Sequence, residues 1–336
     1  MNLKNYKKIL VTGSCGFIGF HLCKRLLSEG FIVVGIDNMN DYYDVSLKES
    51  RLSILNQISS SDFIFHNEDI SNKESIFKIF KKNKFDYVIN LAAQAGVRYS
   101  IDNPGAYMSS NIDGFFSILE ACREFQPKHL IFASSSSVYG MNTSIPFAES
   151  DKTDFPISLY AATKKSNELM AFTYSHLFNI PITGLRFFTV YGPYGRPDMA
   201  YYKFTKSILE GKPIEVYNEG EMKRDFTYID DIIEGIFRLI PETPSIKSAS
   251  STSASAPFDL FNIGNNNPVT LTNFIDVLED CLGIKAKKIN LGMQPGDVLE
   301  TYADIEHLKE KVNYVPKVSI EEGLSKFVDW YVNSDR

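Results

Sequence analysis

The chain has 336 residues, of which 44% are hydrophobic and 23% are charged, and its formal net charge is −6. This length predicts a globular protein with one large domain or two, and the acidic balance offers no basic patch for nucleic acid. No run approaches the roughly 20 apolar residues of a membrane span. The four cysteines lack metal or redox spacing, and the polar N-terminus, 1–8, does not resemble a signal peptide. We therefore expect a cytoplasmic protein with reduced thiols that binds neither membrane nor nucleic acid.

A glycine-rich turn follows the first predicted strand. The apolar run 8–12 leads into the segment Gly13-Ser14-Cys15-Gly16-Phe17-Ile18-Gly19, then a helical pattern, and then a second apolar run that closes on Asp37. This order is typical of a dinucleotide-binding βαβ unit, in which glycines let the backbone approach a pyrophosphate at a helix N-terminus. The glycine spacing is GxxGxxG rather than GxGxxG. Asp37 lies where a carboxylate would bind the adenosine ribose, which favours NAD over NADP.

Strand and helix patterns then alternate as far as residue 188. Apolar strands are predicted at 63–66, 86–91, 129–133 and 182–186, and helices near 76–80, 111–125 and 165–178. Nearly continuous apolar strands separated by helices predict an α/β fold with a parallel, doubly wound Rossmann sheet. Ligands bind such sheets at the carboxyl ends of the strands, and the serine run 134–137 follows one of those ends.

Tyr160 and Lys164 are four residues apart in the helix predicted after the serine run. On a helix, this spacing puts both side chains on one face. An ammonium beside a phenol stabilises the phenolate and lowers its pKa, so Tyr160 could act as an acid or base on a hydroxyl or carbonyl oxygen. Taken alone, so short a pattern is more typical of a surface Tyr and Lys. It gains weight because a dinucleotide-binding unit precedes it.

After residue 188 the predicted elements become shorter. A turn-rich segment, 191–197, precedes a strand near 214–217. The predicted helices lie near 202–210, 230–240, 271–282 and 320–331. We predict an NAD-binding Rossmann domain in 1–188 and a smaller α/β substrate-binding lobe in 189–336, with the chain free to cross back between lobes. The Ser/Ala-rich stretch 245–257 is expected to be a surface loop without chemistry.

Taken together, the motifs resemble the extended short-chain dehydrogenases/reductases that modify nucleotide sugars, over nearly the whole chain. The residues that carry the resemblance are Thr12-Gly13 to Gly19, Asp37, Asp69-Ile70, Leu91-Ala92-Ala93, Ser135 to Gly140, Tyr160 with Lys164, Arg186-Phe187-Phe188 through Tyr191-Gly192-Pro193, Lys223 to Phe226, and Pro295-Gly296-Asp297. Within this group the segments 41–48, 94–98 and 188–199 are most similar to UDP-glucuronate 4-epimerases.

The serine run distinguishes the reactions of related enzymes. Ser136 and Ser137 stand where nucleotide-sugar 4,6-dehydratases carry an Asp-Glu pair and UDP-glucuronate decarboxylases carry a Glu. Two hydroxyls cannot supply the acid and base that dehydration needs at neutral pH. The resemblance therefore implies an isomerase that oxidises C4 of a UDP-sugar, lets the ring rotate, and reduces the 4-keto intermediate again with bound NAD.

The resemblance also implies the site residues. The catalytic residues would be Tyr160 as base for the sugar 4-hydroxyl, Lys164 as its partner, and Ser135 and Ser137 as hydroxyls at the sugar O4. NAD would be bound by Gly13, Gly16, Phe17, Ile18, Gly19, Asp37, Asn38, Asp69, Ile70, Leu91, Ala92, Ala93, Asn111, Tyr160 and Lys164. The UDP-sugar would be bound by Arg98, Ser136, Ser137, Thr189, Arg196, Arg224 and Asp297.

Within the substrate group, Thr189 and Arg196 would hold the C5 carboxylate, since an Arg can pair with a carboxylate through two hydrogen bonds. Arg224 would bind the diphosphate and Asp297 would lie near the uridine ribose. Arg98 could face either the diphosphate or the carboxylate.

Two alternatives stay open. One is a 4-epimerase of neutral UDP-sugars, such as UDP-glucose and UDP-galactose or their N-acetyl forms, against which Arg196 argues. The other is a non-catalytic NAD-binding sensor, against which the Tyr160 and Lys164 pair argues. The sequence shows no metal-ligand constellation. The resemblance further implies a homodimer through the helices near 111–125 and 160–178, and a role in polysaccharide biosynthesis.

Overall fold

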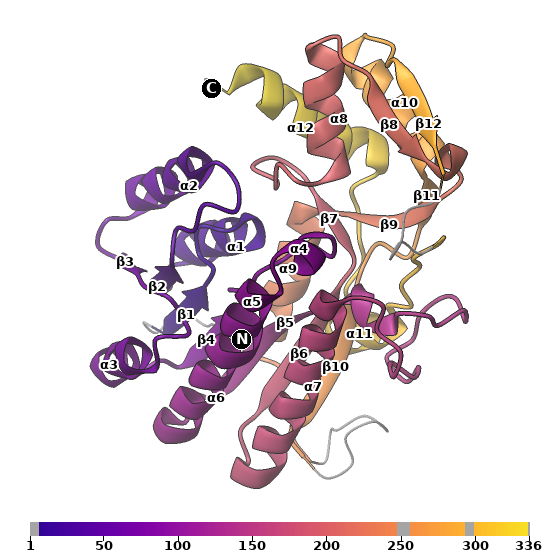
Figure 1. Cartoon of the computed structure of the whole chain (residues 1–336). Helices are drawn as coiled ribbons and strands as arrows, with labels where there is room; N and C mark the ends of the chain where they lie inside the picture. Colours follow the sequence, from indigo (N-terminus) through magenta and orange to yellow (C-terminus); the bar gives the residue numbers. More distant parts are fainter. Residues whose placement is uncertain (1–6, 247–255, 293–298, 335–336) are drawn as a thin grey trace. The chain divides into compact units, whose positions relative to one another are not determined.

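The computed structural model describes residues 7–246, 256–292 and 299–334 and divides into two compact units, whose elements are labelled in Figure 1. The first unit consists of Met1–Asn142, Glu149–Arg186 and Gly235–Phe261, and the second of Thr143–Ala148, Phe187–Glu234 and Asn262–Arg336. The chain therefore passes between the units several times. The assignment of NAD binding to 1–188 and substrate binding to 189–336 stays a prediction. Residues 247–255 of the expected surface loop lie outside the described residues.

A seven-stranded sheet forms the centre of the first unit, in the order β10-β6-β5-β4-β1-β2-β3. Its strands are β1 (Lys8–Thr12), β2 (Ile32–Asp37), β3 (Phe63–Asn67), β4 (Tyr87–Asn90), β5 (His129–Ser135), β6 (Ile182–Phe187) and β10 (Phe258–Ile263). The pairs β1–β2, β2–β3, β1–β4 and β4–β5 are parallel, which confirms the predicted doubly wound sheet. The order reverses between β1 and β4, and such a switch point is where open α/β sheets bind ligands.

Helices cover both faces of this sheet. They are α1 (Phe17–Ser28), α2 (Val45–Ile58), α3 (Lys73–Asn83), α4 (Tyr99–Asp102), α5 (Pro104–Tyr107), a π-helical turn (Met108–Asp113), α6 (Gly114–Phe125), a 3₁₀ turn (Ser136–Tyr139) and α7 (Leu159–Phe178). Figure 1 shows α3, α6 and α7 lying side by side along one face. On the other face α1 meets α9 (Ile229–Leu239), where Arg25 lies 4.6 Å from the centre of the Phe237 ring.

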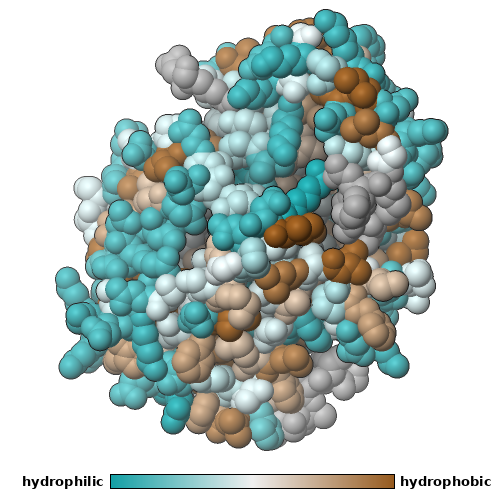
Figure 2. All heavy atoms as spheres, in the orientation of Figure 1, coloured by the Kyte–Doolittle hydropathy of each residue, from teal (hydrophilic) through white to brown (hydrophobic). Residues whose placement is uncertain are grey.

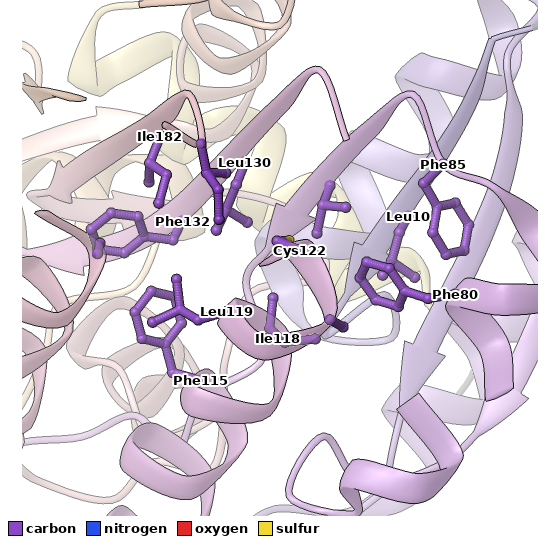
Figure 3. Close-up of a cluster of buried hydrophobic side chains, with 14 of the residues drawn as sticks. Leu10, Phe80, Phe85, Phe115, Ile118, Leu119, Cys122, Leu130, Phe132 and Ile182 are labelled. Atoms are coloured by element: carbon purple, nitrogen blue, oxygen red, sulfur yellow. The ribbon is translucent and has the colours of Figure 1, made fainter. Parts of the chain in front are cut away.

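A hydrophobic core cluster lies between the sheet and α3 and α6. Figure 3 shows Leu10, Leu130 and Ile182 of three strands meeting Phe80 and Phe115 of the two helices. Because helices cover both faces, the strands are apolar at nearly every position, and this produced the continuous apolar runs in the sequence.

The second unit has two small sheets. One orders β11 (Pro268–Thr270), β9 (Lys223–Tyr228) and β7 (Thr189–Tyr191), and the other pairs β12 (Lys288–Leu291) with β8 (Ile214–Tyr217). Its helical elements are α8 (Ala200–Leu209), a 3₁₀ turn (Asn218–Gly220), the first part of α9, α10 (Leu271–Leu282), α11 (Glu306–Val312) and α12 (Ile320–Asn333). The predicted helices near 202–210, 230–240, 271–282 and 320–331 are confirmed, each within two residues at either end.

In the part of the chain that the structure describes, no helix is both long and apolar enough to cross a membrane. Among the same residues, no three His, Cys, Asp or Glu side chains gather as metal ligands would.

Candidate active site

The glycine turn between β1 and α1 lies at the switch point of the sheet. Gly13 has a φ of +69°, and a side chain there would place its Cβ 2.8 Å from the Ala92 backbone nitrogen. At Gly19 a Cβ would lie 2.0 Å from the Gly13 carbonyl oxygen, so α1 packs directly onto the turn. No side chain caps the N-terminus of α1, which begins at Phe17 and Ile18. These features fit a backbone that must approach a pyrophosphate closely.

Asp37 ends β2 with its carboxylate already held by the protein. Its Oδ2 accepts a hydrogen bond from the Cys15 amide at 3.0 Å, and its Oδ1 accepts one from the Met39 amide at 2.9 Å. The Lys48 ammonium lies 3.8 Å from Oδ1. The carboxylate is thus fixed between the glycine turn and the segment that follows β2, close to where the ribose was expected.

Lys48 and Arg51 are site neighbours that the sequence did not reveal. Both are buried on α2, and Arg51 Nη1 donates to the Cys15 carbonyl and to Tyr43 Oη, at 2.7 Å each. Burial lowers the pKa of Lys48, while Asp37 opposes that shift. The one available signal was their i, i+3 spacing, which puts two cations on one helix face.

Asn38 and Asp69 are joined at the ends of β2 and β3. The Asn38 amide donates to Asp69 Oδ2 at 2.7 Å, and Ser71 donates to Asp69 Oδ1 through its amide and its hydroxyl. Burial acts to raise the pKa of Asp69, but the bonds from Ser71 and Asn38 outweigh it, so the pKa is lowered. Ile70 is buried beside them, against Gly114.

The exit of β4, Leu91-Ala92-Ala93, is held by β1, because the Thr12 hydroxyl accepts from the Ala92 amide at 3.1 Å. Asn111 stands next to this exit, in the π-helical turn. Its Oδ1 accepts from the Gln94 amide, and its Nδ2 donates to the Gln94 carbonyl and to Thr163 Oγ1. The polar groups of Asn111, a residue expected to bind NAD, thus connect the β4 exit to α7 through hydrogen bonds.

Tyr160 and Lys164 lie in the first two turns of α7, which Ser158 caps by accepting from the Ala161 amide at 3.1 Å. Lys164 is buried, and its ammonium donates to the Ala133 carbonyl of β5 at 2.9 Å and lies 6.0 Å from the centre of the Tyr160 ring. Burial lowers the pKa of Lys164 to about 8. The predicted pair therefore shares one helix face, beside the end of β5.

Tyr107 packs edge-on against the Tyr160 ring, with the ring centres 6.1 Å apart. Its hydroxyl donates to the carbonyls of Ala95 and Gly96, and so fixes the loop that leads to Arg98 at the start of α4. Arg98 itself is exposed.

The four serines 134–137, at the end of β5 and the start of the 3₁₀ turn, are not equivalent. Ser135 Oγ donates to Ser137 Oγ at 3.1 Å and accepts from the Ser137 amide at 3.2 Å, which caps the 3₁₀ turn. Ser134 is buried and donates instead to Glu168. Ser136 and Ser137 are half-buried. Ser135 and Ser137 thus form a linked pair of hydroxyls, two and four residues past the carbonyl that holds Lys164.

The remaining expected substrate residues belong to the second unit. Arg196 forks onto Asp198, with Nε 2.9 Å from Oδ1 and Nη2 2.5 Å from Oδ2. Thr189 opens β7, next to β9, in which Arg224 Nη1 donates to the carbonyls of Lys223 and Leu299 at 2.9 and 3.3 Å.

Asp297, expected near the uridine ribose, lies outside the described residues.

Comparisons with known proteins add to this geometry. Residues 9–259 match a family model described as "NAD dependent epimerase/dehydratase family". The chain is 54% identical over 331 residues to "Protein CapI" of Staphylococcus aureus, covering 97% of this chain and 98% of that protein. It is 47% identical to the "Probable UDP-glucuronate 4-epimerase" of Rhizobium meliloti, covering 96% of each. It is similar in structure to the UDP-glucuronic acid 4-epimerase of Bacillus cereus in complex with UDP-glucuronic acid and NAD, with a TM-score of 0.86 and 37% identity, covering 96% of this chain and 98% of that one.

Proposed function

The chain belongs to the NAD dependent epimerase/dehydratase family, and we propose that it interconverts UDP-glucuronate and UDP-galacturonate. The reaction is oxidation at C4 to a 4-keto intermediate, rotation of the ring, and reduction on the other face. The observation that carries this proposal is the likeness along almost the whole chain to a solved enzyme that binds UDP-glucuronic acid and NAD. The buried Lys164 beside Tyr160 at the carboxyl end of the sheet supports it.

The residues at the switch point fit NAD. The glycine turn is too close to its neighbours for side chains, α1 has no side-chain cap, and the Asp37 carboxylate is fixed at the end of β2. NAD supplies the acceptor and donor of the hydride that leaves and returns to C4. Asp69 and Asn38 extend the same edge of the sheet, on the adenosine side of the expected cofactor position.

Tyr160 would take the proton of the sugar 4-hydroxyl, and the hydroxyl of Ser135 or Ser137 would bridge the same oxygen and Tyr160. Lys164 would hold its positive charge beside the developing phenolate. In the structure Ser135 Oγ donates to Ser137 Oγ, so the Ser135 hydroxyl would have to turn away from Ser137 to donate to the sugar oxygen. The serine run contains no carboxylate that could drive an elimination, and this is consistent with simple epimerisation.

Thr189 and Arg196 would bind the C5 carboxylate of the sugar. A β-keto acid loses carbon dioxide when its carboxylate aligns with the ketone π-system, so the enzyme must restrain this group. Arg196 already pairs with Asp198 through Nε and Nη2. The uronate must therefore take the Nη1 edge of the guanidinium or displace Asp198.

One observation favours a second candidate, a 4-epimerase of neutral UDP-sugars. Such a sugar would leave the Arg196–Asp198 pair undisturbed. The two candidates differ in their response to Asp198→Asn. Removing that charge should lower the KM for UDP-glucuronate several-fold if Arg196 binds the uronate, and should leave the KM for UDP-glucose unchanged.

The deciding experiment is incubation with UDP-glucuronate alone, followed by sugar analysis. UDP-galacturonate without added NAD and without net NADH is expected, because the hydride returns to the carbon that it left. A substrate deuterated at C4 should keep its label. A UDP-pentose product would indicate a decarboxylase, and turnover of UDP-glucose alone would favour the second candidate.

We also propose that the protein is a homodimer that pairs through α6 and α7. Figure 2 shows hydrophobic side chains gathered where these helices lie in Figure 1, and the exposed apolar residues there include Phe116, Leu169 and Leu177. A cluster of exposed apolar side chains on adjacent helices is typical of an interface. Sedimentation of Leu169→Glu against the unmodified chain tests it, and an unchanged mass would reject this face. A cytoplasmic location stays a prediction.

A further inference from the structure

A buried ion pair, Glu168 with Arg186, has no part in the proposed reaction. Nε and Nη2 of Arg186 donate to Oε1 and Oε2 of Glu168 at 2.9 Å each, and the side chains are only 2% and 3% exposed. Ser134 Oγ also donates to Glu168 Oε1, at 2.6 Å. Burial acts to raise the pKa of Glu168, but Arg186 and Ser134 outweigh it, so the pKa is lowered and the carboxylate stays charged.

Glu168 connects the pair to α7, the helix that carries Tyr160 and Lys164. Glu168 lies one turn after Lys164 and two turns after Tyr160 on α7, so the three share a face. Its partner Ser134 directly precedes Ser135 at the end of β5. Movement of Glu168 would therefore move α7 relative to the serine hydroxyls.

On the side of Arg186, the pair reaches the turn that carries the serines. Arg186 Nη1 donates to Tyr139 Oη at 3.0 Å and to the Glu149 carbonyl at 3.3 Å. Tyr139 ends the 3₁₀ turn that begins at Ser136, and its ring centre lies 4.9 Å from the guanidinium carbon. One network thus contacts α7, β5, β6 and the 3₁₀ turn.

Stability alone is a poor explanation for this arrangement. Two buried charges lose their hydration, and apolar groups of similar volume often replace such a pair without loss of stability. A bidentate fork, however, fixes direction as well as distance between the elements that it joins. The pair carries no net charge, so its removal leaves the net charge beside Lys164 unchanged, although Lys165 Nζ, 3.6 Å from Glu168 Oε2, loses a partner.

We propose that Glu168 and Arg186 are positioning residues that set the register of α7 against β5 and the 3₁₀ turn, and so hold Tyr160 and Lys164 at working distance from Ser135. The kinetic part of this inference rests on the proposed epimerase reaction. A misplacement of about 1 Å between reacting groups can slow a reaction about a hundredfold, so a slip of α7 would lower kcat far more than it would change KM.

The test is the double variant Glu168→Leu with Arg186→Met, which replaces the pair by apolar groups and leaves no buried charge unpaired. We expect a folded protein with its NAD, a KM within about threefold of wild type, and a kcat lower by at least about tenfold. The pH dependence of kcat should keep its shape, because the net charge beside Lys164 is unchanged. A folded double variant with wild-type kcat would overturn the proposal.

The matched control is the double variant His129→Leu with Thr183→Val. It removes a different buried polar contact, the 2.8 Å bond between Thr183 Oγ1 and His129 Nε2, which joins β6 to β5 at the ends opposite to the serine run. It should lose stability with kcat unchanged. An equal fall of kcat in both double variants would show a general effect of destabilisation and would also overturn the proposal.

Milder variants decide the question if the double variant does not fold. Ser134→Ala and Tyr139→Phe each delete one hydrogen bond of the network. Each should lower kcat by a factor of about two to ten with NAD retained, and wild-type kcat in both would reject the proposal.

A structural readout separates this inference from the proposed function. In crystals of the NAD-bound double variant, the first turn of α7 should shift against Ser135 by more than about 0.5 Å, the tolerance of a working site. If wild-type protein does not convert UDP-glucuronate, the proposed function fails while the shift still tests the pair. An unshifted α7 would overturn the inference whatever the substrate.

Discussion

Two cations of the proposed site, Lys164 in the first unit and Arg196 in the second, are held in opposite ways. In the first unit, Lys164 bonds to a carbonyl 31 positions away, and the buried fork between Glu168 and Arg186 spans 18 positions. In the second unit, Arg196 forks onto Asp198, two positions along the chain, and both side chains are about one quarter exposed. A bond between distant segments fixes where two elements stand, whereas a bond within one turn orders that turn alone. The bond of Lys164 therefore fixes α7 against β5, whereas the pairing of Arg196 with Asp198 orders their own turn.

The largest loss of activity is expected from Tyr160→Phe, in the first unit. The ring keeps its contact with Tyr107, but the proton acceptor is gone. Turnover of UDP-glucuronate should fall by about 10²–10⁴-fold, with NAD content unchanged. The measurements are the rate of epimerisation and the NAD released on denaturation. Activity within about tenfold of wild type, or about 1.4 kcal/mol of barrier, would remove Tyr160 as the base.

Asp37→Ala removes a carboxylate that both the cofactor and the protein use. The amides of Cys15 and Met39 lose their acceptor, and the buried Lys48 loses its nearby anion. We expect NAD affinity to fall by about 10–100-fold, since charge-assisted bonds contribute about 1.5–3 kcal/mol each. Binding of NAD to the stripped protein is the measurement. Asp37→Asn, which keeps an acceptor oxygen, is the control, and its NAD affinity should lie between those of the wild type and Asp37→Ala. A full complement of NAD in purified Asp37→Ala would refute the assignment.

The proposed carboxylate-binding residues of the second unit are tested by Arg196→Ala and Thr189→Val. Loss of a charge-assisted pair should raise the KM for UDP-glucuronate about 10-fold or more in Arg196→Ala, and by less in Thr189→Val. Both should also release more UDP-pentose or its 4-keto form, because an unrestrained carboxylate can align with the ketone. Wild-type KM and no decarboxylated product in either variant would make a neutral-sugar epimerase the better proposal.

The smallest expected effect concerns how turnover and folding stability depend on pH. Because burial lowers the pKa of Lys164 to about 8, turnover should decline as the pH rises through about 8, when the ammonium is lost. Stability should respond in the other direction. Between about pH 8 and the ordinary value of 10.5 the unfolded chain binds more protons than the folded one, so stability rises with pH across that window. Denaturant unfolding of Lys164→Met should lack this rise, and an identical profile in both proteins would contradict the lowered pKa.

The sequence predicted most elements whose apolar residues repeat regularly, and it missed α2, whose buried face is largely polar. Helix α2 has Lys48, Arg51 and Leu55 on its buried face, so no apolar period marked it. The strand β10 reads as an apolar run, but its pairing with β6 depends on a segment more than 70 residues earlier, which no local pattern encodes.

In the site, too, the local sequence patterns could be predicted and the contacts that depend on the fold could not. The glycine turn and the Tyr160–Lys164 spacing are local patterns, so they could be predicted. Four identical serines gave no sign that Ser134 bonds to Glu168 while Ser135 bonds to Ser137. Asn111 was expected at the cofactor from the resemblance alone, and only the fold shows its bonds to Gln94 and Thr163.

The return of the chain to the first unit has a consequence for attempts to isolate that unit. β10 is the outermost strand of the sheet and covers β6, every residue of which is buried, and Leu260 approaches Gly184 across the pair. A fragment that ended at residue 188 would turn β6 into a long, apolar edge with unpaired amides and carbonyls, which is a template for intermolecular pairing. Such a fragment should precipitate on expression. A soluble version would need residues 235–263 grafted back onto it, so that the last strand of the sheet is supplied in the same molecule.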